Sequence, residues 1–157
     1  MKKILNVHDY SNTTSLALLT ARVGISVLML THGIPKLMML FSGSPIQFPS
    51  VFGMSPELSL GLTVFAEVFC SILIVAGLAT RLATVPLLIT MLVAATIIHA
   101  ADPFAAKELA LMYLLAYIVL LFAGSGKYSI DFLLSRKNMA VTYANRKVQD
   151  PRATVYQ

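Results

Sequence analysis

Four ionisable residues lie inside long apolar runs of this sequence: Arg22, His32, Glu67 and His99. An ionised side chain is unfavourable in hydrocarbon, so residues of this kind usually face the interior of a helical bundle and mark functional sites. A histidine with a carboxylate partner can relay protons near neutral pH, and the same groups can hydrogen-bond the head of a quinone. Two histidines on facing helices could instead ligate haem iron or another metal. The residue types alone leave these alternatives open.

Arg22 and Glu67 are predicted to form a buried ion pair. In a bundle whose first helix runs outward and whose second runs inward, Arg22 lies on the order of 10 Å and Glu67 roughly 16 Å from the inner surface. This difference is within the combined reach of the two side chains, and either charge alone would be unfavourable in lipid. The pair could simply fix the register of the two helices, or Glu67 could also accept a proton or anchor a ligand.

A polar layer is predicted near the outer ends of the helices. His32 and Lys36 are one helical turn apart near the end of the first apolar run. His99 closes the third run and Glu108 opens the fourth, at the same end of an antiparallel bundle. We therefore expect a ligand pocket in the outer half of the bundle, lined by His32, Lys36, Glu67, His99 and Glu108. We assign no catalytic residue and no metal site. Lys36 alone is also explained as a helix end that extends its ammonium to the lipid headgroups.

The elements that must position these residues are four apolar stretches. The chain has 157 residues, of which 57% are hydrophobic and 12% are charged, whereas soluble domains carry about 25% charged residues. The stretches cover residues 15–40, 58–78, 82–101 and 108–123, and a helix needs about 20 residues to cross a bilayer. Because backbone polar groups in lipid must be satisfied within each span, the stretches predict helices. The predicted fold is all-α, an integral membrane four-helix bundle with up-down-up-down topology.

Lysines and arginines mark one side of this predicted bundle. They precede the first span, occupy the turn between the second and third spans, and follow the fourth span: Lys2, Lys3, Arg81, Lys127, Arg136, Lys137, Arg146, Lys147 and Arg152. The positive-inside rule therefore predicts cytoplasmic N and C termini, which agrees with an even number of spans. The expected division is a cytoplasmic N-terminal segment (1–14), a four-helix domain (15–132) and a basic cytoplasmic tail (133–157).

Charge and cysteine content argue against several other classes of protein. The net charge of +5 comes mostly from cations that flank apolar runs, so it does not predict nucleic-acid binding. Cys70 is the single cysteine, which excludes an intramolecular disulfide and a CxxC redox pair. The first residues lack the apolar core and cleavage site of a signal peptide, so we expect no cleaved leader.

Several short motifs, in this order, resemble those of the DoxX family: ARVG, HGIPKL, FAEVF, GLATRLA and GSGKYSID. The resemblance covers residues 15–132, and its signature positions are Arg22, His32, Gly33, Lys36, Glu67, Arg81, His99 and Glu108. Ser125 stands where proline is common in the family. The resemblance implies a small four-helix protein of a bacterial or archaeal inner membrane, related to the small subunit of thiosulfate:quinone oxidoreductase. It also implies assembly with soluble redox enzymes, as some members of the family do.

From these features together we expect a membrane subunit associated with quinone-linked or oxidative-stress redox chemistry. If it is an enzyme, it would be an oxidoreductase subunit, with quinone as a candidate cofactor ahead of haem. The expected partners are the lipid bilayer, a redox enzyme and a second copy of the chain. Two other functions stay open: a non-catalytic scaffold that recruits redox enzymes, and a small transporter or proton pathway.

Overall fold

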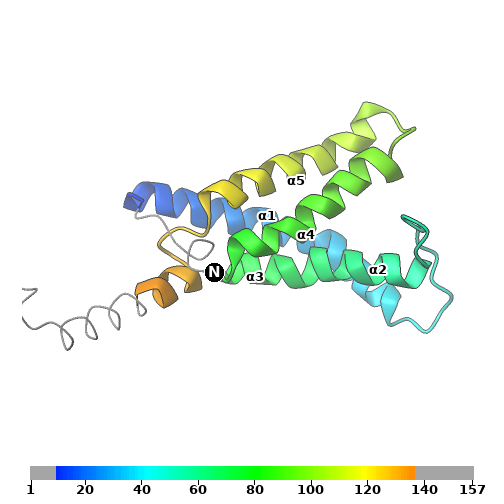
Figure 1. The fold of residues 1–157 in the computed structure, drawn as a ribbon, viewed down its shortest axis with the longest axis horizontal. Helices are drawn as coiled ribbons and strands as arrows, with labels where there is room; N and C mark the ends of the chain where they lie inside the picture. The colour runs from blue at the N-terminus through cyan, green and yellow to red at the C-terminus, as the bar shows by residue number, and fades with distance from the viewer. Residues whose placement is uncertain (1–9, 137–157) are drawn as a thin grey trace, which may run out of the picture.

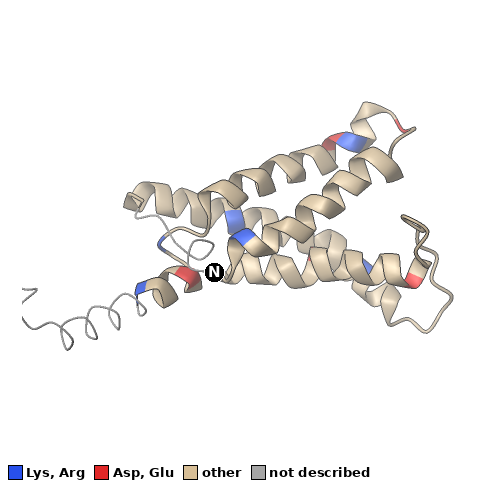
Figure 2. Cartoon of the chain, in the orientation of Figure 1, with Lys and Arg blue, Asp and Glu red and all other residues tan. Residues whose placement is uncertain are grey.

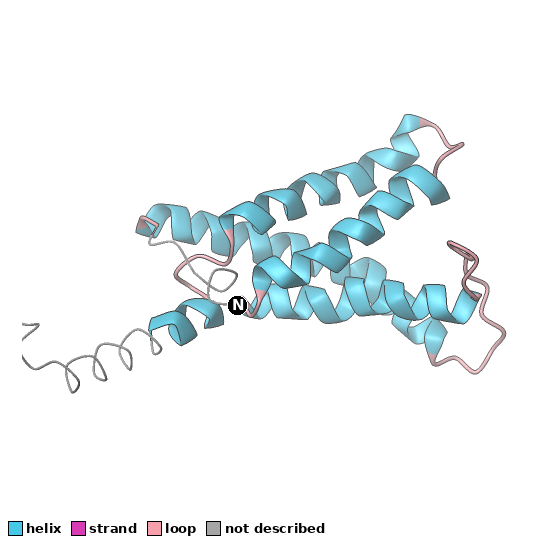
Figure 3. Cartoon of the chain, viewed as in Figure 1, coloured by secondary structure: helices cyan, strands magenta, loops and turns pink. Residues whose placement is uncertain are grey.

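The computed structural model of the chain describes residues 10–136, and all regular structure in this part is helical (Figure 3). Most of the predicted N-terminal segment and tail, residues 1–9 and 137–157, lies outside the described residues. Between residues 10 and 123 the helical elements, two of them π-helical, are α1 (Asn12–Leu40), α2 (Pro56–Val64), η1 (Phe65–Cys70), α3 (Ser71–Ala76), α4 (Thr80–Val93), η2 (Ala94–Ile98) and α5 (Phe104–Ala123). A further short helix covers residues 130–136.

Four helical stretches are long and apolar enough to cross a membrane: Asn12–Leu40, Pro56–Ala76, Thr80–Ile98 and Phe104–Ala123. The predicted all-helical fold with four spans is therefore confirmed for the described residues, and the chain is a multi-pass membrane protein. The fourth span begins at Phe104, directly after Pro103, and so is longer than predicted. Proline lacks an N–H group and fits well at the start of a helix, where that group would have no partner.

Local sequence sets the ends of these helices. Ser11 caps α1 by accepting a hydrogen bond from Thr14 N at 3.2 Å, and Ser55 caps α2 by accepting one from Leu58 N at 3.3 Å. Such caps satisfy backbone N–H groups that have no partner in the first helical turn. Gly77 ends α3 with φ +69°, a left-handed conformation that glycine adopts without a steric penalty.

The four spans form two antiparallel hairpins. In one hairpin α1 packs along the span made of α2, η1 and α3, and in the other α4 and η2 pack along α5. Contacts of η1 with α4, and of α1 with α5, join the hairpins. Figure 1 shows that the hairpins meet near the turn from α3 to α4 and diverge toward the opposite end. The shared core lies where the four spans meet, and it includes Met29, Ile74, Leu87, Tyr117 and Leu120.

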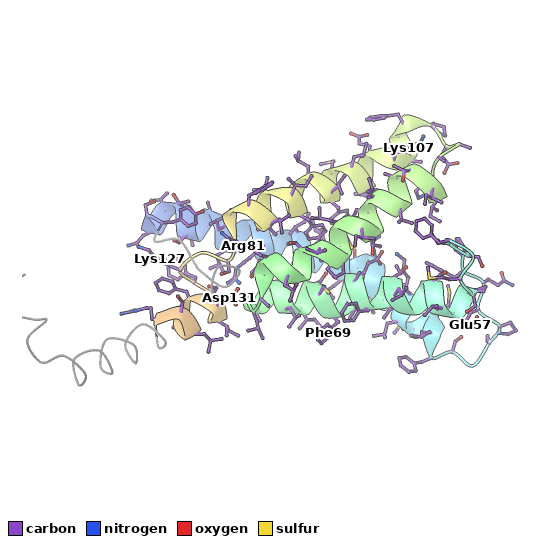
Figure 4. All side chains as sticks on the ribbon, viewed as in Figure 1. Glu57, Phe69, Arg81, Lys107, Lys127 and Asp131 are labelled. Carbon is purple, nitrogen blue, oxygen red and sulfur yellow. The ribbon has the colours of Figure 1, made fainter. Side chains whose placement is uncertain are left out.

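Large apolar side chains cover the outside of the bundle. Phe65 and Phe69 stack with their ring centroids 5.3 Å apart, and about half of each residue is exposed. Figure 4 shows Phe69 pointing away from the neighbouring helices. In a membrane-spanning bundle such residues face lipid, whereas small and polar residues pack between the helices. The buried serines and threonines of this chain, among them Ser26 and Ser71, follow the same rule.

Candidate functional site

Glu67 forms an ion pair with Lys36 inside the bundle. Lys36 Nζ lies 2.5 Å from Oε1 and 2.6 Å from Oε2 of Glu67, so both carboxylate oxygens accept a hydrogen bond. The Glu67 side chain is 2% exposed, and the Lys36 side chain is 29% exposed. Removing either charge would leave the other without its partner in a poorly solvated environment, so the two residues depend on each other.

This pairing corrects the predicted Arg22–Glu67 ion pair. Gly33 lies directly against Glu67, since a Cβ atom at Gly33 would be 3.0 Å from Glu67 Cβ. Arg22 precedes Gly33 by about three helical turns, or roughly 16 Å, and this separation exceeds the reach of the two side chains. The register of the helices therefore matches Glu67 with Lys36, which lies one turn beyond Gly33.

Two local features bring Glu67 close to α1. The glycine at position 33 lets the helices approach, because a Cβ atom there would lie 2.8 Å from Val68 Cγ2. Glu67 itself belongs to the π-helical segment η1. Such turns are rare in proteins, and those that occur are often found at functional sites. The HGIPK motif thus supplies both the residue that permits close packing, Gly33, and the cation that meets the carboxylate, Lys36.

Aromatic residues of α1 and α5 border the ion pair. The rings of His32 and Tyr113 meet edge to face, with their centroids 5.8 Å apart, and Tyr113 interacts electrostatically with Glu67. Tyr113 in turn stacks on Tyr117, with the ring centroids 6.3 Å apart. The first, second and fourth spans therefore contribute to a site that combines an ammonium, a carboxylate, an imidazole and a phenol.

His99 and Glu108 lie at the tip of the other hairpin. His99 Nδ1 is 2.7 Å from Asp102 Oδ2, and the two side chains are 37% and 48% exposed. Glu108 is also exposed, on the second turn of α5. The charges of this tip are separate from those of the α1–α2 hairpin in Figure 2, and Figure 4 labels Lys107 and Glu57 at the two tips. His99 and Glu108, two of the predicted pocket residues, therefore lie apart from the Lys36–Glu67 ion pair and the aromatic residues around it.

Arg22 is buried near the end where the hairpins meet. Its guanidinium donates from Nη1 to Ile74 O at 3.2 Å and from Nη2 to Tyr128 O, and the residue is 2% exposed. A Cβ atom at Gly77 would overlap Arg22 Nη1, so any side chain at that position would displace the guanidinium. Asp131 interacts electrostatically with Arg22, and this opposite charge offsets part of the penalty for burying a cation.

Asp131 joins the last described segment to the turn between the second and third spans. Its Oδ1 accepts a hydrogen bond from Ala79 N at 2.7 Å, and its Oδ2 accepts one from Thr80 N at 3.2 Å. Ala79 has φ +49° and offers no side-chain cap, so Asp131 caps α4 from a distant part of the sequence. Arg81 Nη2 donates to Phe122 O at 3.1 Å at the same end of the molecule (Figure 4). The GLATR turn and the GSGKYSID segment are thereby fixed to each other.

Sequence reasoning did not single out Asp131. It noted the two motifs that meet here but had no basis for placing one against the other. The available signal was a single acidic residue in a stretch that otherwise carries cations, Lys127 and Arg136. An acidic residue so placed suits the start of a helix, where it satisfies free N–H groups and interacts favourably with the helix dipole.

Comparison with known proteins identifies the family of this fold. A family model described as DoxX matches residues 17–100, a range that is more than half of the chain and that contains Lys36 and Glu67. The chain belongs to the DoxX family. The uncharacterized membrane protein Rv3486 of Mycobacterium tuberculosis (strain ATCC 25618 / H37Rv) is similar to this DoxX protein, with 30% identity over 133 residues, 76% of this chain and 82% of that protein. No solved structure matches the chain.

In this DoxX protein the matched range contains the ion pair, Gly33 and Arg22. It ends at residue 100, before Tyr113 on α5 and before the segment that carries Asp131. The match therefore assigns the family and covers the first three spans, but it assigns no activity.

Proposed function

We propose that this DoxX protein is a membrane subunit of a redox system and that it binds a quinone head at the Lys36–Glu67 pair. The observation that supports the proposal is the pair itself, with a carboxylate 2% exposed and an ammonium 29% exposed within membrane-spanning helices. Charged residues within spans are unfavourable and usually serve a ligand or a proton pathway. The resemblance to the small subunit of a quinone oxidoreductase favours a quinone over other ligands.

The side chains around the pair suit the chemistry of a quinone head. Lys36 can donate a hydrogen bond to a quinone carbonyl, and Glu67 can accept one from a quinol hydroxyl. His32 and Tyr113 add further polar groups and an aromatic surface from α1 and α5. Oxidation of a quinol releases electrons to a redox partner and protons to nearby bases, and Glu67 is placed to accept one of these protons.

The same geometry favours a quinone over haem. A bis-histidine haem site needs two imidazoles that face each other across the iron. His32 packs against Tyr113, whereas His99 pairs with Asp102 at the tip of the other hairpin. Within residues 10–136, no group of three or more His, Cys, Asp or Glu residues could hold a metal ion.

Mass spectrometry of lipids extracted from the protein, purified in mild detergent, tests the quinone proposal. We expect quinone to copurify with the unsubstituted protein and to be depleted in Lys36→Met, because the donor to the quinone carbonyl is gone. Lys107→Met is the matched control, since Lys107 lies at the other tip and donates to Ala100 O at 2.8 Å. No copurified quinone, or equal amounts in all three proteins, would contradict the proposal.

A non-catalytic scaffold is the second candidate function. The observation that favours it is that the charged groups satisfy each other: Glu67 pairs with Lys36, and His99 pairs with Asp102. As a scaffold, the protein would use the Lys36–Glu67 pair only to fix helix register. Replacing both charges, in Lys36→Met/Glu67→Gln, would then leave the assembly of a redox partner at the membrane intact. Loss of that assembly in a folded double variant would count against the scaffold.

We further propose that the protein lies in the cytoplasmic membrane of a bacterium or archaeon, with both termini on the cytoplasmic side. The support is the distribution of cations at the end where the hairpins meet. Arg81 and Lys127 both lie at this end (Figure 4), and the described chain also begins and ends there (Figure 1). Because lysine and arginine are enriched on the cytoplasmic side of membrane proteins, we assign this end to the cytoplasmic side.

A further inference from the structure

Six buried side-chain atoms have no hydrogen-bond partner among residues 10–136: Ser15 Oγ, Arg22 Nε, Ser26 Oγ, Ser71 Oγ, Thr80 Oγ1 and Tyr117 Oη. All belong to residues that are at most 2% exposed. Buried polar groups in proteins almost always have a partner, and lipid cannot supply one. These atoms therefore need a partner inside the bundle.

Three of these hydroxyl groups lie at one level of the core. The two contacts that fix the register of α1 against the second span, at Arg22 and at Gly33, bring Ser26 level with Ser71. Tyr117 of α5 lies near hydrogen-bonding range of Ser71, and a bond between the two hydroxyl groups would use only one of their two donor hydrogens. Ser26, Ser71 and Tyr117 are all 0% exposed. The helices α1, α3 and α5 therefore each contribute a hydroxyl group to the same buried layer.

This layer lies between the two charged sites of the bundle. On one side, Ser26 follows Arg22 by one helical turn on the same face of α1. On the other side, Tyr117 stacks on Tyr113, and Tyr113 interacts electrostatically with Glu67. A column of polar groups thus runs through the core from Arg22 to the ion pair, over about 21 Å of α1.

We propose that this column holds bound water molecules, hydrogen-bonded to Ser26, Ser71, Tyr117 and Arg22 Nε. Water suits this set of groups because each hydroxyl can both donate and accept, whereas Arg22 Nε can only donate. Buried water typically makes about three hydrogen bonds to groups that otherwise lack a partner. The water extends a hydrogen-bonded path from the Arg22 end of the bundle to Tyr117, which stacks on Tyr113 beside the ion pair. This inference does not rest on quinone binding.

X-ray radiolytic labelling of the full chain in lipid nanodiscs tests the proposal, because hydroxyl radicals form from bound water in place and oxidise adjacent side chains. We expect Tyr117 to be oxidised although it is 0% exposed. Ser71→Val removes a hydroxyl and fills the layer with methyl groups, so the labelling of Tyr117 should be lost. Thr63→Val is the matched control on the same span, because Thr63 Oγ1 already donates to Ser59 O at 2.8 Å. It should leave the labelling unchanged.

A second measurement covers the case in which Ser71→Val does not fold. Ser26→Ala and Ser71→Ala each remove one hydroxyl with little change in volume. In a hydrated column each substitution takes a partner from a water molecule and lowers the melting temperature by a few degrees. In a dry core each removes an unsatisfied group and raises the melting temperature. Absence of Tyr117 labelling in the unsubstituted protein, or a rise in melting temperature for both alanine variants, would overturn the proposal.

Discussion

The Glu67 side chain contacts Lys36 through both of its oxygens inside the bundle, at 2.5 and 2.6 Å. Lys36 is the more exposed member of the pair, so the proposed ligand would reach the ammonium before the carboxylate. A ligand that accepts a hydrogen bond from Lys36 competes with the Glu67 carboxylate for the same N–H donors. The pair is therefore a structural contact and a candidate binding group at once, and substitutions can separate the two roles.

We expect Lys36→Met to destabilise the protein more than the double substitution Lys36→Met/Glu67→Gln. The single substitution leaves a buried carboxylate without its partner, which typically costs about 3–5 kcal/mol. The double substitution leaves a neutral amide, whose burial is far less unfavourable. Thermal unfolding of the purified variants in detergent measures the difference. Equal melting temperatures for the two variants would show that the charges do not depend on each other.

Gly77→Ala should destabilise the protein more than Gly53→Ala. Both glycines have a left-handed backbone, with φ +69° and +73°, so both substitutions carry a backbone penalty of about 1–2 kcal/mol. Only at Gly77 would the new Cβ atom also displace the Arg22 guanidinium, since nothing lies within 4 Å of a Cβ atom at Gly53. The free energies of unfolding of the two variants isolate the effect of this close contact. A similar loss of stability at both positions would show that the Arg22 guanidinium does not lie against Gly77.

The helices show which structural features a sequence determines locally. Length and hydrophobicity decide where a span lies, so the four spans were predicted to within a few residues of their observed ends. The register between spans depends on contacts such as that of Gly33 with Glu67, and residue counts from the helix ends did not resolve it. For this reason Arg22 was predicted as the partner of Glu67, although Lys36 was assigned to the same candidate pocket as Glu67. The π-helical segment η1 was also not predicted, because one extra residue in a turn leaves composition unchanged.

Asp131→Ala should destabilise the protein by about 1–2 kcal/mol, the usual loss when a helix cap is removed. Asp131 accepts hydrogen bonds from Ala79 N and Thr80 N and so stabilises the start of α4. Asp102→Ala is the control, because Asp102 is exposed and pairs only with the neighbouring His99, an interaction of small expected value. Chemical unfolding of both variants gives the comparison. An equal effect of the two substitutions would mean that Asp131 is not the cap of α4.

The whole molecule differs from the predicted bundle in how its two hairpins meet. A compact bundle of parallel axes would bring the polar ends of all four spans into one layer, and this was the basis of the predicted five-residue pocket. The observed hairpins diverge toward that end (Figure 1), so His99 and Glu108 are carried away from Lys36. The angle between hairpins depends on side-chain packing across their contact near η1 and α4, and the pattern of apolar runs does not encode it.

The proposed topology predicts a difference between two introduced cysteines. The native Cys70 is 2% exposed, so it should contribute little background with a membrane-impermeant thiol reagent. In intact cells stripped of any outer envelope, we expect Ser44→Cys, in the exposed connection after α1, to be labelled. Arg136→Cys, at the opposite end, should be labelled only after lysis. Labelling of Arg136→Cys in intact cells would place the cation-rich end outside.

The π-helical turns of the second and third spans each contain one residue more than a regular helical turn. In a regular α-helix an extra residue would rotate every side chain that follows by about 100° around the helix axis, whereas a π-helical turn takes up the extra residue within the turn itself. A chain that lacked one residue within Phe65–Cys70 could therefore keep its second span and its loops and still turn a different side chain toward Gly33. A single-residue insertion or deletion at this point would change which group α1 meets, with no change in the number of spans.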